Sequence, residues 1–208
     1  MYNDLVYIRD EKCDGVGPWT WIKTDNGAWD GPRRDWENSH KQNIQKYVTD
    51  WSICVQAGGN QGVYPNLLSV MFNDVYTFEP DPLNFYCLVD NCQRDNIYKL
   101  QAAVGKQSGL CRVVRNNMDN TGMHKVDDKS GFVPMLTIDS LKLPSCGLIA
   151  LDVERYEQNA LEGALETIER CKPVIQCEVG TDAILDLLRP FGYDKVAQSV
   201  SDTFYKVV

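Results

Sequence analysis

The sequence has 208 residues, of which 43% are hydrophobic and 10% aromatic, a composition typical of a globular chain rather than a disordered one. Its formal net charge is −8. This charge argues against a nucleic-acid backbone as the main partner, because a polyanion requires a clustered cationic face. A small molecule or a saccharide is easier to accommodate.

Eight cysteines occur without any C-x-x-C pair, which argues against a zinc ribbon or a thioredoxin-like redox site. Two of them, Cys54 and Cys177, fall inside predicted core strands. Met1–Asp10 carries charges where a signal peptide needs an apolar run, and no stretch reaches the ~20 apolar residues of a membrane span. We therefore expect a cytoplasmic protein with reduced thiols and no membrane partner.

The length suits one α/β domain, residues 51–208, preceded by an extension, residues 1–50. In the extension we expect a short strand at Val6–Ile8 and a helix that ends near Tyr47, with Asp35 as its N-cap. Glycines and prolines surround four tryptophans there: Trp19, Trp21, Trp29 and Trp36. Either these rings cover an edge of the core, or the extension is a lid over a ligand cleft.

The domain begins with its most informative stretch. Ser52–Gln56 is predicted to be a strand, Ala57–Gly62 a glycine-rich turn, Val63–Phe72 a helix and Val75–Phe78 a second strand, followed by Glu79. Glycines let a ligand approach the main chain, and N–H groups at a helix start favour an anionic group. A carboxylate about twenty residues after the turn can accept hydrogen bonds from a ribose diol. The predicted ligand is an adenosine-containing cofactor.

Strands and helices continue to alternate along the rest of the chain. The expected strands are Ile97–Val104, Gly109–Val114, Val133–Thr137, Gly147–Leu151 and Pro173–Cys177, with a closing hairpin of Val196–Val200 and Phe204–Val208 around Ser201 and Asp202. The expected helices are Pro82–Cys92, Glu157–Cys171 and Thr181–Leu188. Asp139 is predicted to cap a turn at Ser140–Lys142, and the polar stretch 116–130 to be a mobile loop. This order predicts a doubly wound, mostly parallel sheet with an antiparallel final strand.

Ligands of such sheets bind outside the carboxyl ends of the strands. Six positions or segments fall on that rim: the turn Ala57–Gly62, Glu79, Val104, Asp152, Glu154 and Glu178. We therefore place the candidate site there.

The turn Gln56-Ala57-Gly58-Gly59-Asn60-Gln61-Gly62 lacks the G-x-G-x-x-G spacing of a dinucleotide site. Together with Phe78-Glu79-Pro80 and Asp152-Val153-Glu154, it resembles the FkbM-like family of S-adenosylmethionine-dependent methyltransferases, in which the first strand ends in D-x-G-A-N-x-G and the second in F-E-P. The resemblance runs from Asp50 to Val208. It implies a Rossmann-like class I methyltransferase fold, with a doubly wound, seven-stranded, mostly parallel sheet and a C-terminal antiparallel hairpin.

The resemblance also implies site residues. The expected cofactor contacts are Gln56, Ala57, Gly58, Gly59, Asn60, Gly62, Glu79, Pro80, Ala103, Val104 and Asp152. Glu79 would bind the ribose, or be an ordinary surface carboxylate, and Ala103 and Val104 would contact adenine. The glycine turn would hold the methionine moiety, or be a plain tight turn. Asn60 would contact the cofactor, or merely tolerate a left-handed conformation.

Asp152 and Glu154 are the candidate catalytic residues. Asp152 would take a proton from the acceptor, hold the amino end of the cofactor, or be structural. Glu154 would act on the acceptor side, or be a carboxylate favoured near a helix N-terminus. Arg155, Glu178 and His40 are candidate substrate contacts, and no metal site is predicted.

Three residues depart from the family pattern. Gln56 replaces the aspartate that opens the turn, Ala150 stands where relatives have lysine, and Arg155 replaces a glycine. Arg155 could pair with Glu157 or Glu178. The two histidines, His40 and His124, are expected at the surface, although a folded-back N-terminal helix could bring the first into the cleft.

The function expected from these residues is S-adenosylmethionine-dependent methyl transfer, directed to a hydroxyl of a small molecule or saccharide. A nicotinamide-dependent oxidoreductase using the same turn and Glu79 is the alternative enzyme. A nucleotide-binding module without catalysis, its chemistry lost with Gln56 and Ala150, is the non-enzymatic alternative.

Overall fold

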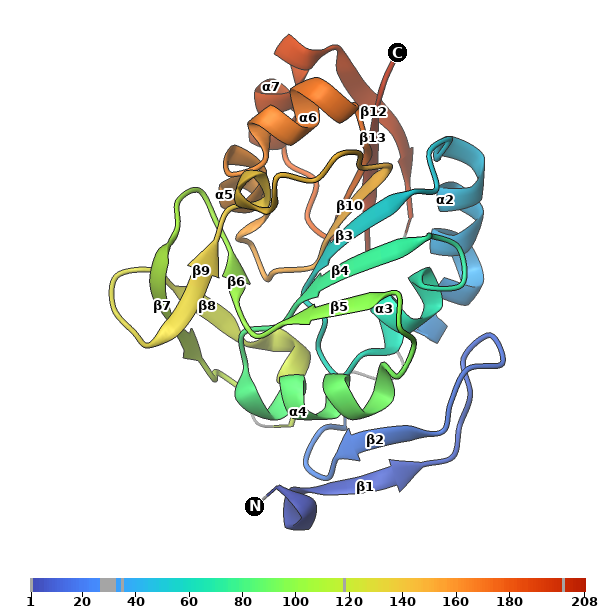
Figure 1. The fold of residues 1–208 in the computed structure, drawn as a ribbon, viewed down its shortest axis with the longest axis vertical. Helices are drawn as coiled ribbons and strands as arrows, with labels where there is room; N and C mark the ends of the chain where they lie inside the picture. The colour runs from blue at the N-terminus through green and yellow to red at the C-terminus, as the bar shows by residue number, and fades with distance from the viewer. Residues whose placement is uncertain (1, 27–32, 35, 118, 200) are drawn as a thin grey trace.

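A seven-stranded sheet lies at the centre of the computed structural model, which describes residues 2–26, 33, 34, 36–117, 119–199 and 201–208 (Figure 1). The strand order is β12-β13-β11-β10-β3-β4-β5. Its parallel part consists of β3 (Ile53–Ala57), β4 (Asp74–Phe78), β5 (Ile97–Leu100), β10 (Leu148–Leu151) and β11 (Val174–Cys177). The mostly parallel α/β sheet predicted from the sequence is thus confirmed.

The C-terminal hairpin closes one edge of this sheet. β12 (Tyr193–Gln198) pairs antiparallel with β13 (Thr203–Val207), and β13 pairs antiparallel with β11. The hairpin is antiparallel as predicted, but its first strand begins at Tyr193 rather than Val196, and its register shifts between Lys195 and Ala197.

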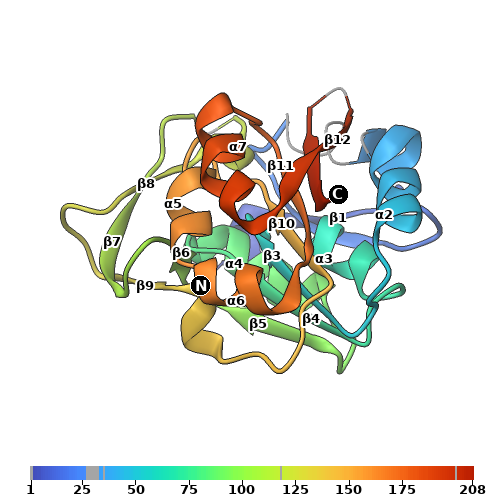
Figure 2. The ribbon, with the colours of Figure 1, turned by 90° about the horizontal axis from the view of Figure 1, so that it is seen from above.

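Helices cover both faces of the sheet (Figures 1 and 2). Because successive side chains of a strand point to opposite faces, Val55 packs in one core and Cys54 in the other. The first core is covered by α5 (Glu157–Glu162), α6 (Leu165–Cys171) and α7 (Asp182–Leu188). The second is covered by α2 (Lys41–Tyr47) and α3 (Val63–Leu68), while α4 (Pro82–Asn91) packs beside β5. Short helical turns are η1 (Asn3–Leu5), η2 (Trp36–His40), η3 (Thr121–Met123), η4 (Ile138–Leu141) and η5 (Arg189–Phe191).

A second sheet was not predicted. It has the order β6-β9-β7-β8 and consists of β6 (Ala103–Val104), β7 (Gly109–Val114), β8 (Lys125–Asp127) and β9 (Val133–Leu136). The prediction of a single strand at Ile97–Val104 was wrong, because this segment forms two strands, β5 in the central sheet and β6 in the second sheet. The loop expected at 116–130 was also wrong, because its described residues include η3 and β8. Its Thr121 is buried and bonded to Asp25, so this polar stretch is held by protein groups rather than by solvent.

Two details of the helices differ from expectation. The helix expected at Glu157–Cys171 is divided at Gly163 into α5 and α6. Asp139 does not cap its own turn, where the Thr137 side chain accepts from the Ser140 N–H at 3.1 Å. The Asp139 carboxylate instead accepts from the Thr167 N–H at 2.8 Å and caps the start of α6.

The N-terminal segment packs onto the domain. β1 (Val6–Arg9) and β2 (Trp19–Ile22) form an antiparallel pair, which confirms the strand expected at Val6–Ile8. Trp19, Trp21 and Trp36 are each 1% exposed and belong to the core cluster that contains sheet residues. This burial supports the interpretation of the tryptophans as a core edge. Trp29 and the predicted cap Asp35 lie outside the described residues.

Seven of the eight cysteines are buried, and Cys171 is half-buried. None of the helices in the described part of the chain is long and apolar enough to cross a bilayer.

Candidate functional site

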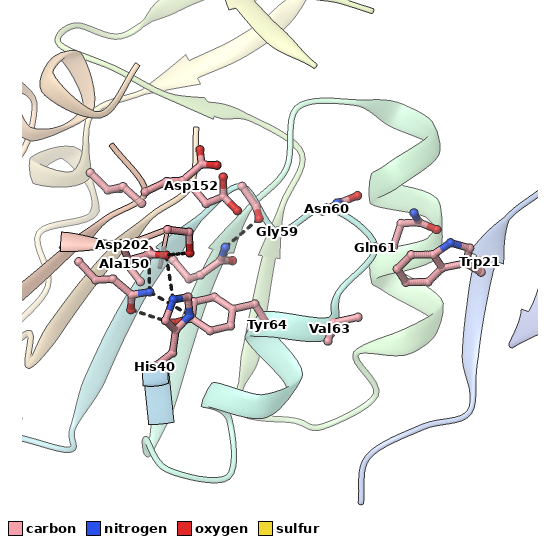
Figure 3. A pocket seen from close by; sticks show the side chains of 16 residues that line it. Trp21, His40, Gly59, Asn60, Gln61, Val63, Tyr64, Ala150, Asp152 and Asp202 are labelled. Atoms are coloured by element: carbon pink, nitrogen blue, oxygen red, sulfur yellow. Dashed lines mark hydrogen bonds and ion pairs between the residues drawn. The ribbon is translucent and has the colours of Figure 1, made fainter. Parts of the chain in front are cut away.

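Two adjoining cavities open at the carboxyl ends of the parallel strands. The first, which we call the β4-side cavity, is lined by Glu79, Pro80, Ala103, Val104 and Glu154, among others. The second, the β11-side cavity, is lined by residues that include His40, Gln56, Gly59, Gln176, Glu178 and Asp202 (Figure 3). Gly58, Asn60 and Asp152 line both cavities. The predicted rim residues are therefore brought together where the two cavities meet.

Glu79 lies at the end of β4 and is only 5% exposed. Its Oε2 accepts from the Asn60 N–H at 2.7 Å, and its Oε1 from the Asp81 N–H at 2.7 Å. Burial raises the pKa of Glu79 to about 7, although these two hydrogen bonds lower it. A carboxylate oxygen has two lone pairs, so each oxygen of Glu79 can accept one further hydrogen bond from a ligand hydroxyl in the β4-side cavity.

The glycine turn is tightly packed. Gly58 has a φ of +84°, and a Cβ there would lie 1.8 Å from the carbonyl oxygen of Asp152. The N–H groups of Gly58 and Gly59 both donate to the Phe78 carbonyl oxygen, at 3.0 and 2.8 Å. The end of β4 therefore accepts from both amides. The turn positions Asn60, itself left-handed with a φ of +45°, at the junction of the cavities.

Three carboxylates, Asp152, Glu154 and Glu178, each place an oxygen atom within 4.8 Å of the others. Burial raises the pKa of Asp152 well above its usual range, and the charges of Glu178 and Asp202 raise it further. Burial, followed by the charge of Glu154, also raises the pKa of Glu178. A cluster of this kind favours either a shared proton or a bound positive charge.

The segment after β10 is strained. Glu154 and Arg155 have φ angles of +52° and +71°, a left-handed conformation that non-glycine residues adopt at a cost of ~1–2 kcal/mol each. This conformation accounts for the glycine that relatives have at the position of Arg155. Neither alternative considered for Arg155, a side-chain pair with Glu157 or with Glu178, occurs among the described residues, and the Glu157 carboxylate bonds the Arg155 backbone N–H instead. Arg155 itself is exposed and forms no ion pair among the described residues.

Gln56 is held from both ends of its amide. Its Nε2 donates to the Gly58 carbonyl at 2.9 Å, and its Oε1 accepts from the Thr77 hydroxyl at 2.5 Å. The side chain therefore braces the turn from within the β11-side cavity, which Ala150 also lines.

The surface position expected for both histidines was wrong, and for His40 the structure shows the alternative, a side chain brought into the cleft by the N-terminal segment. His40 is 6% exposed and lines the β11-side cavity, 2.8 Å from Asp202. His124 lines the β4-side cavity, and its Nδ1 lies 3.2 Å from Asp81. Arg115 binds the same carboxylate at 2.7 Å. Hydrogen bonds from both residues lower the pKa of Asp81 well below its usual range, although burial opposes the shift.

Several site residues were not found from the sequence. Asp202 had been assigned only to a turn, and Gln176 only to a strand, yet both line the β11-side cavity with His40 and Tyr64. At the other end of this cavity, the Ile22 N–H donates to the Gln61 side chain at 2.8 Å, and Gln61 in turn donates to Asp25. Figure 3 shows His40, Tyr64 and Asp202 grouped together, with Trp21 and Gln61 far from them. Local sequence carries no signal for these contacts, which join distant segments.

Two predicted site residues lie outside the described linings of both cavities: Gly62 and Arg155. Gly62 packs instead against α4, where a Cβ would lie 2.9 Å from the Cys92 sulfur. The remaining predicted contacts all line one cavity or both.

Comparison with known proteins identifies the family to which this chain is related. The family model described as the methyltransferase FkbM domain matches residues 56–195. A methyltransferase FkbM from Methylobacillus flagellatus KT has a similar structure, with a TM-score of 0.55 and 16% identity over 81% of this chain and 46% of that chain. Wild-type Trm5b from Pyrococcus abyssi superposes with a TM-score of 0.53 and 11% identity over 98% of this chain and 55% of that chain.

At these identities the two structures establish a shared fold. This chain spans about half the length of each, 46% and 55%. No protein of curated function matches its sequence.

Proposed function

This chain belongs to the FkbM methyltransferase family, whose model spans residues 56–195, and on that premise we propose that it transfers the methyl group of S-adenosylmethionine to a hydroxyl of a small molecule or saccharide. The observation that carries the proposal is the pair of cavities that meet at Gly58, Asn60 and Asp152. One cavity suits a nucleoside, and the other can hold a second reactant beside it.

The β4-side cavity has the donor and acceptor groups that an adenosyl group requires. Glu79 offers a free lone pair on each oxygen to the ribose diol, as its two backbone partners occupy the others. Ala103 and Val104 provide an apolar wall for adenine, since both side chains are buried beside the cavity. S-adenosylmethionine, when bound, supplies an electrophilic methyl carbon on a positively charged sulfur.

The carboxylate cluster is suited to that positive charge. Asp152 stands at the junction of the cavities with Glu154 and Glu178 close by. Burial and then the charges of neighbouring carboxylates raise the pKa values of Asp152 and Glu178. A sulfonium or ammonium group would relieve this repulsion. In this proposal Asp152 holds the amino end of the cofactor, a contact that Gln56 cannot make as an ion pair. Glu178 lines the β11-side cavity and faces the acceptor, whereas Glu154 lines the β4-side cavity.

The β11-side cavity favours an acceptor that is not anionic. Among its described lining residues are three carboxylates, Asp152, Glu178 and Asp202, and neither lysine nor arginine. A phosphate or carboxylate group would be repelled there, whereas a neutral hydroxyl compound would find hydrogen-bonding partners. The protein's main contribution is to align this hydroxyl with the methyl group, and such positioning can supply ~7–11 kcal/mol.

Cofactor titration tests the proposal. We expect S-adenosylhomocysteine to bind the full chain in isothermal titration calorimetry and NAD not to bind. Binding of NAD alone would support the oxidoreductase instead. Binding of S-adenosylhomocysteine without turnover across sugars, catechols and hydroxy acids would support a module that has lost its catalysis.

A further inference from the structure

His40 reaches the β11-side cavity from outside the segment that the family model matches. It is the last residue of η2, at the start of α2, and its side chain is almost fully buried. The imidazole ring lies edge-on to Tyr64 and to Phe204, with ring centroids 5.7 and 6.2 Å apart. These two aromatic neighbours fix the plane of the ring at the wall of the cavity, where Figure 3 shows His40 beside Tyr64.

The polar contacts of the ring define its orientation. His40 Nε2 lies 2.8 Å from Asp202 Oδ2, which also accepts from the Ser201 hydroxyl at 2.6 Å. Asp202 Oδ1 accepts from Gln176 Nε2 at 2.9 Å. The side-chain oxygen of Gln176, Oε1, accepts from the Tyr64 hydroxyl at 2.7 Å. Because the carboxylate can only accept, Nε2 must carry a hydrogen.

The other ring nitrogen is less firmly engaged. The neutral ring then has a lone pair on Nδ1, whose nearest protein donor, Gln176 Nε2, lies 3.4 Å away, a long hydrogen bond. Burial alone would raise the pKa of Asp202, but hydrogen bonds from His40, Ser201 and Gln176 lower it. The carboxylate therefore stays charged and can stabilise a positive imidazolium beside it.

We propose that His40, oriented by Asp202, is the general base of the methyl transfer and takes the acceptor's hydroxyl proton at Nδ1. The inference rests on the proposed function, since it needs an acceptor hydroxyl in the β11-side cavity. The acceptor O–H bond breaks as an N–H bond forms at Nδ1, and the oxygen bonds the methyl carbon. The carbon–sulfur bond breaks with its electron pair left on sulfur. The products are a methyl ether, S-adenosylhomocysteine and an imidazolium paired with Asp202.

In this assignment, Asp152 and His40 have different roles on two walls of the β11-side cavity. Asp152, with Glu178 and Glu154 nearby, lies in a cluster that favours positive charge. His40 faces the same cavity from the N-terminal segment and has a separate carboxylate of its own. A carboxylate engaged with a cation is a weak base, whereas a neutral imidazole paired with a carboxylate is a suitable one.

The tautomer of His40 gives the first test. The chain has two histidines, so long-range ¹H–¹⁵N spectra of histidine-labelled protein saturated with S-adenosylhomocysteine contain two ring systems, and the His40→Gln variant assigns them. We expect the neutral ring to carry hydrogen on Nε2 and none on Nδ1. A neutral ring with hydrogen on Nδ1 would overturn the proposal.

Kinetics give the second test, with the acceptor that releases most S-adenosylhomocysteine in a panel of sugars, catechols and hydroxy acids. General-base catalysis contributes ~10²–10⁴-fold, so His40→Gln should lower kcat by that factor. A base removed without harm to binding leaves the KM for S-adenosylmethionine and the Kd of S-adenosylhomocysteine within about threefold of the wild type. Imidazole in the buffer should restore part of the turnover of His40→Ala. Lys46→Gln, an exposed change on α2, is the matched control.

The outcomes separate the two proposals. A wild-type chain that does not bind S-adenosylhomocysteine would contradict the proposed function itself. Normal binding with wild-type kcat in His40→Gln would contradict only the role of His40. If His40→Gln fails to fold, Asp202→Asn keeps the imidazole and removes the charge beside it, and an unchanged kcat in that variant would equally overturn the proposal.

Discussion

Replacement of Glu79 by glutamine should affect the affinity for the cofactor and the stability of the fold in different ways. The amide keeps the shape of the side chain but removes the charge that two ligand hydroxyl groups would meet. Hydrogen bonds to a charged group contribute ~1.5–3 kcal/mol, so S-adenosylhomocysteine should bind about 10- to 150-fold more weakly to Glu79→Gln.

The raised pKa of Glu79 adds a dependence on pH. Ribose hydroxyls donate to the ionised carboxylate, so binding favours the charged form and lowers its pKa below the value of about 7 in the free protein. Affinity should therefore be constant at high pH and fall as pH drops through 7. About one tenth of the carboxylate is ionised at pH 6, which corresponds to roughly tenfold weaker binding than at pH 8.

Stability should change in the opposite direction. The folded pKa lies above the unfolded value of 4.5, so the stability that Glu79 contributes is present below 4.5 and is lost as pH rises to about 7. Glutamine does not ionise, so the variant does not lose this stability. Between pH 5 and pH 8, the free energy of unfolding in urea should therefore fall less for Glu79→Gln than for the wild type.

Calorimetry at pH 6, 7 and 8 measures the affinities, and Glu169→Gln, an exposed change on α6, is the control. Equal affinity of Glu79→Gln and wild type at pH 8, with both folded, would refute the assignment of Glu79 to the site. A wild-type affinity that does not vary with pH would refute the role of its ionisation.

Four further changes test other parts of the structure. Gly58→Ala should abolish S-adenosylhomocysteine binding in calorimetry, because its Cβ would lie 1.8 Å from the Asp152 carbonyl, whereas Gly109→Ala, with open space around it, should bind normally. Trp36→Ala should lower the free energy of unfolding by ~3–5 kcal/mol in urea, as expected for a buried aromatic ring. A loss near zero would mean that the N-terminal segment is not part of the core. Arg155→Gly should raise that free energy by about 1 kcal/mol by relieving a φ of +71°, and a decrease would contradict the strain. Dialysis against EDTA should leave turnover unchanged, and activity restored by Mg²⁺ would instead assign a metal to the carboxylate cluster.

The elements that sequence patterns predicted well are those whose environment is uniform. β3 and β10 are buried on both faces, so they are apolar apart from Gln56 in β3, and a parallel sheet brings their carboxyl ends to one rim. That rule is sufficient to predict from the sequence that Glu79, Asp152 and Glu178 lie on one rim, where they line the two cavities.

The parts that sequence could not predict depend on partners far along the chain. The amides of Gly58 and Gly59 both donate to the Phe78 carbonyl, a contact between β4 and the turn that the local sequence does not indicate. His40 looked like a surface residue because its partner, Asp202, lies in the last hairpin. The polar composition of stretch 116–130 predicted a mobile loop. Composition does not reveal that its polar side chains have buried partners, such as Asp25 for Thr121.

The central claim is that the adenosyl group binds in the β4-side cavity and the acceptor in the β11-side cavity. A crystal structure of the full chain with S-adenosylhomocysteine tests this claim most directly. The account predicts ribose hydroxyls within hydrogen-bond distance of Glu79, adenine against Ala103 and Val104, and the sulfur at Gly58 and Asp152, facing the β11-side cavity and His40. A ligand whose ribose lies away from Glu79, or whose sulfur is walled off from the β11-side cavity, would contradict it.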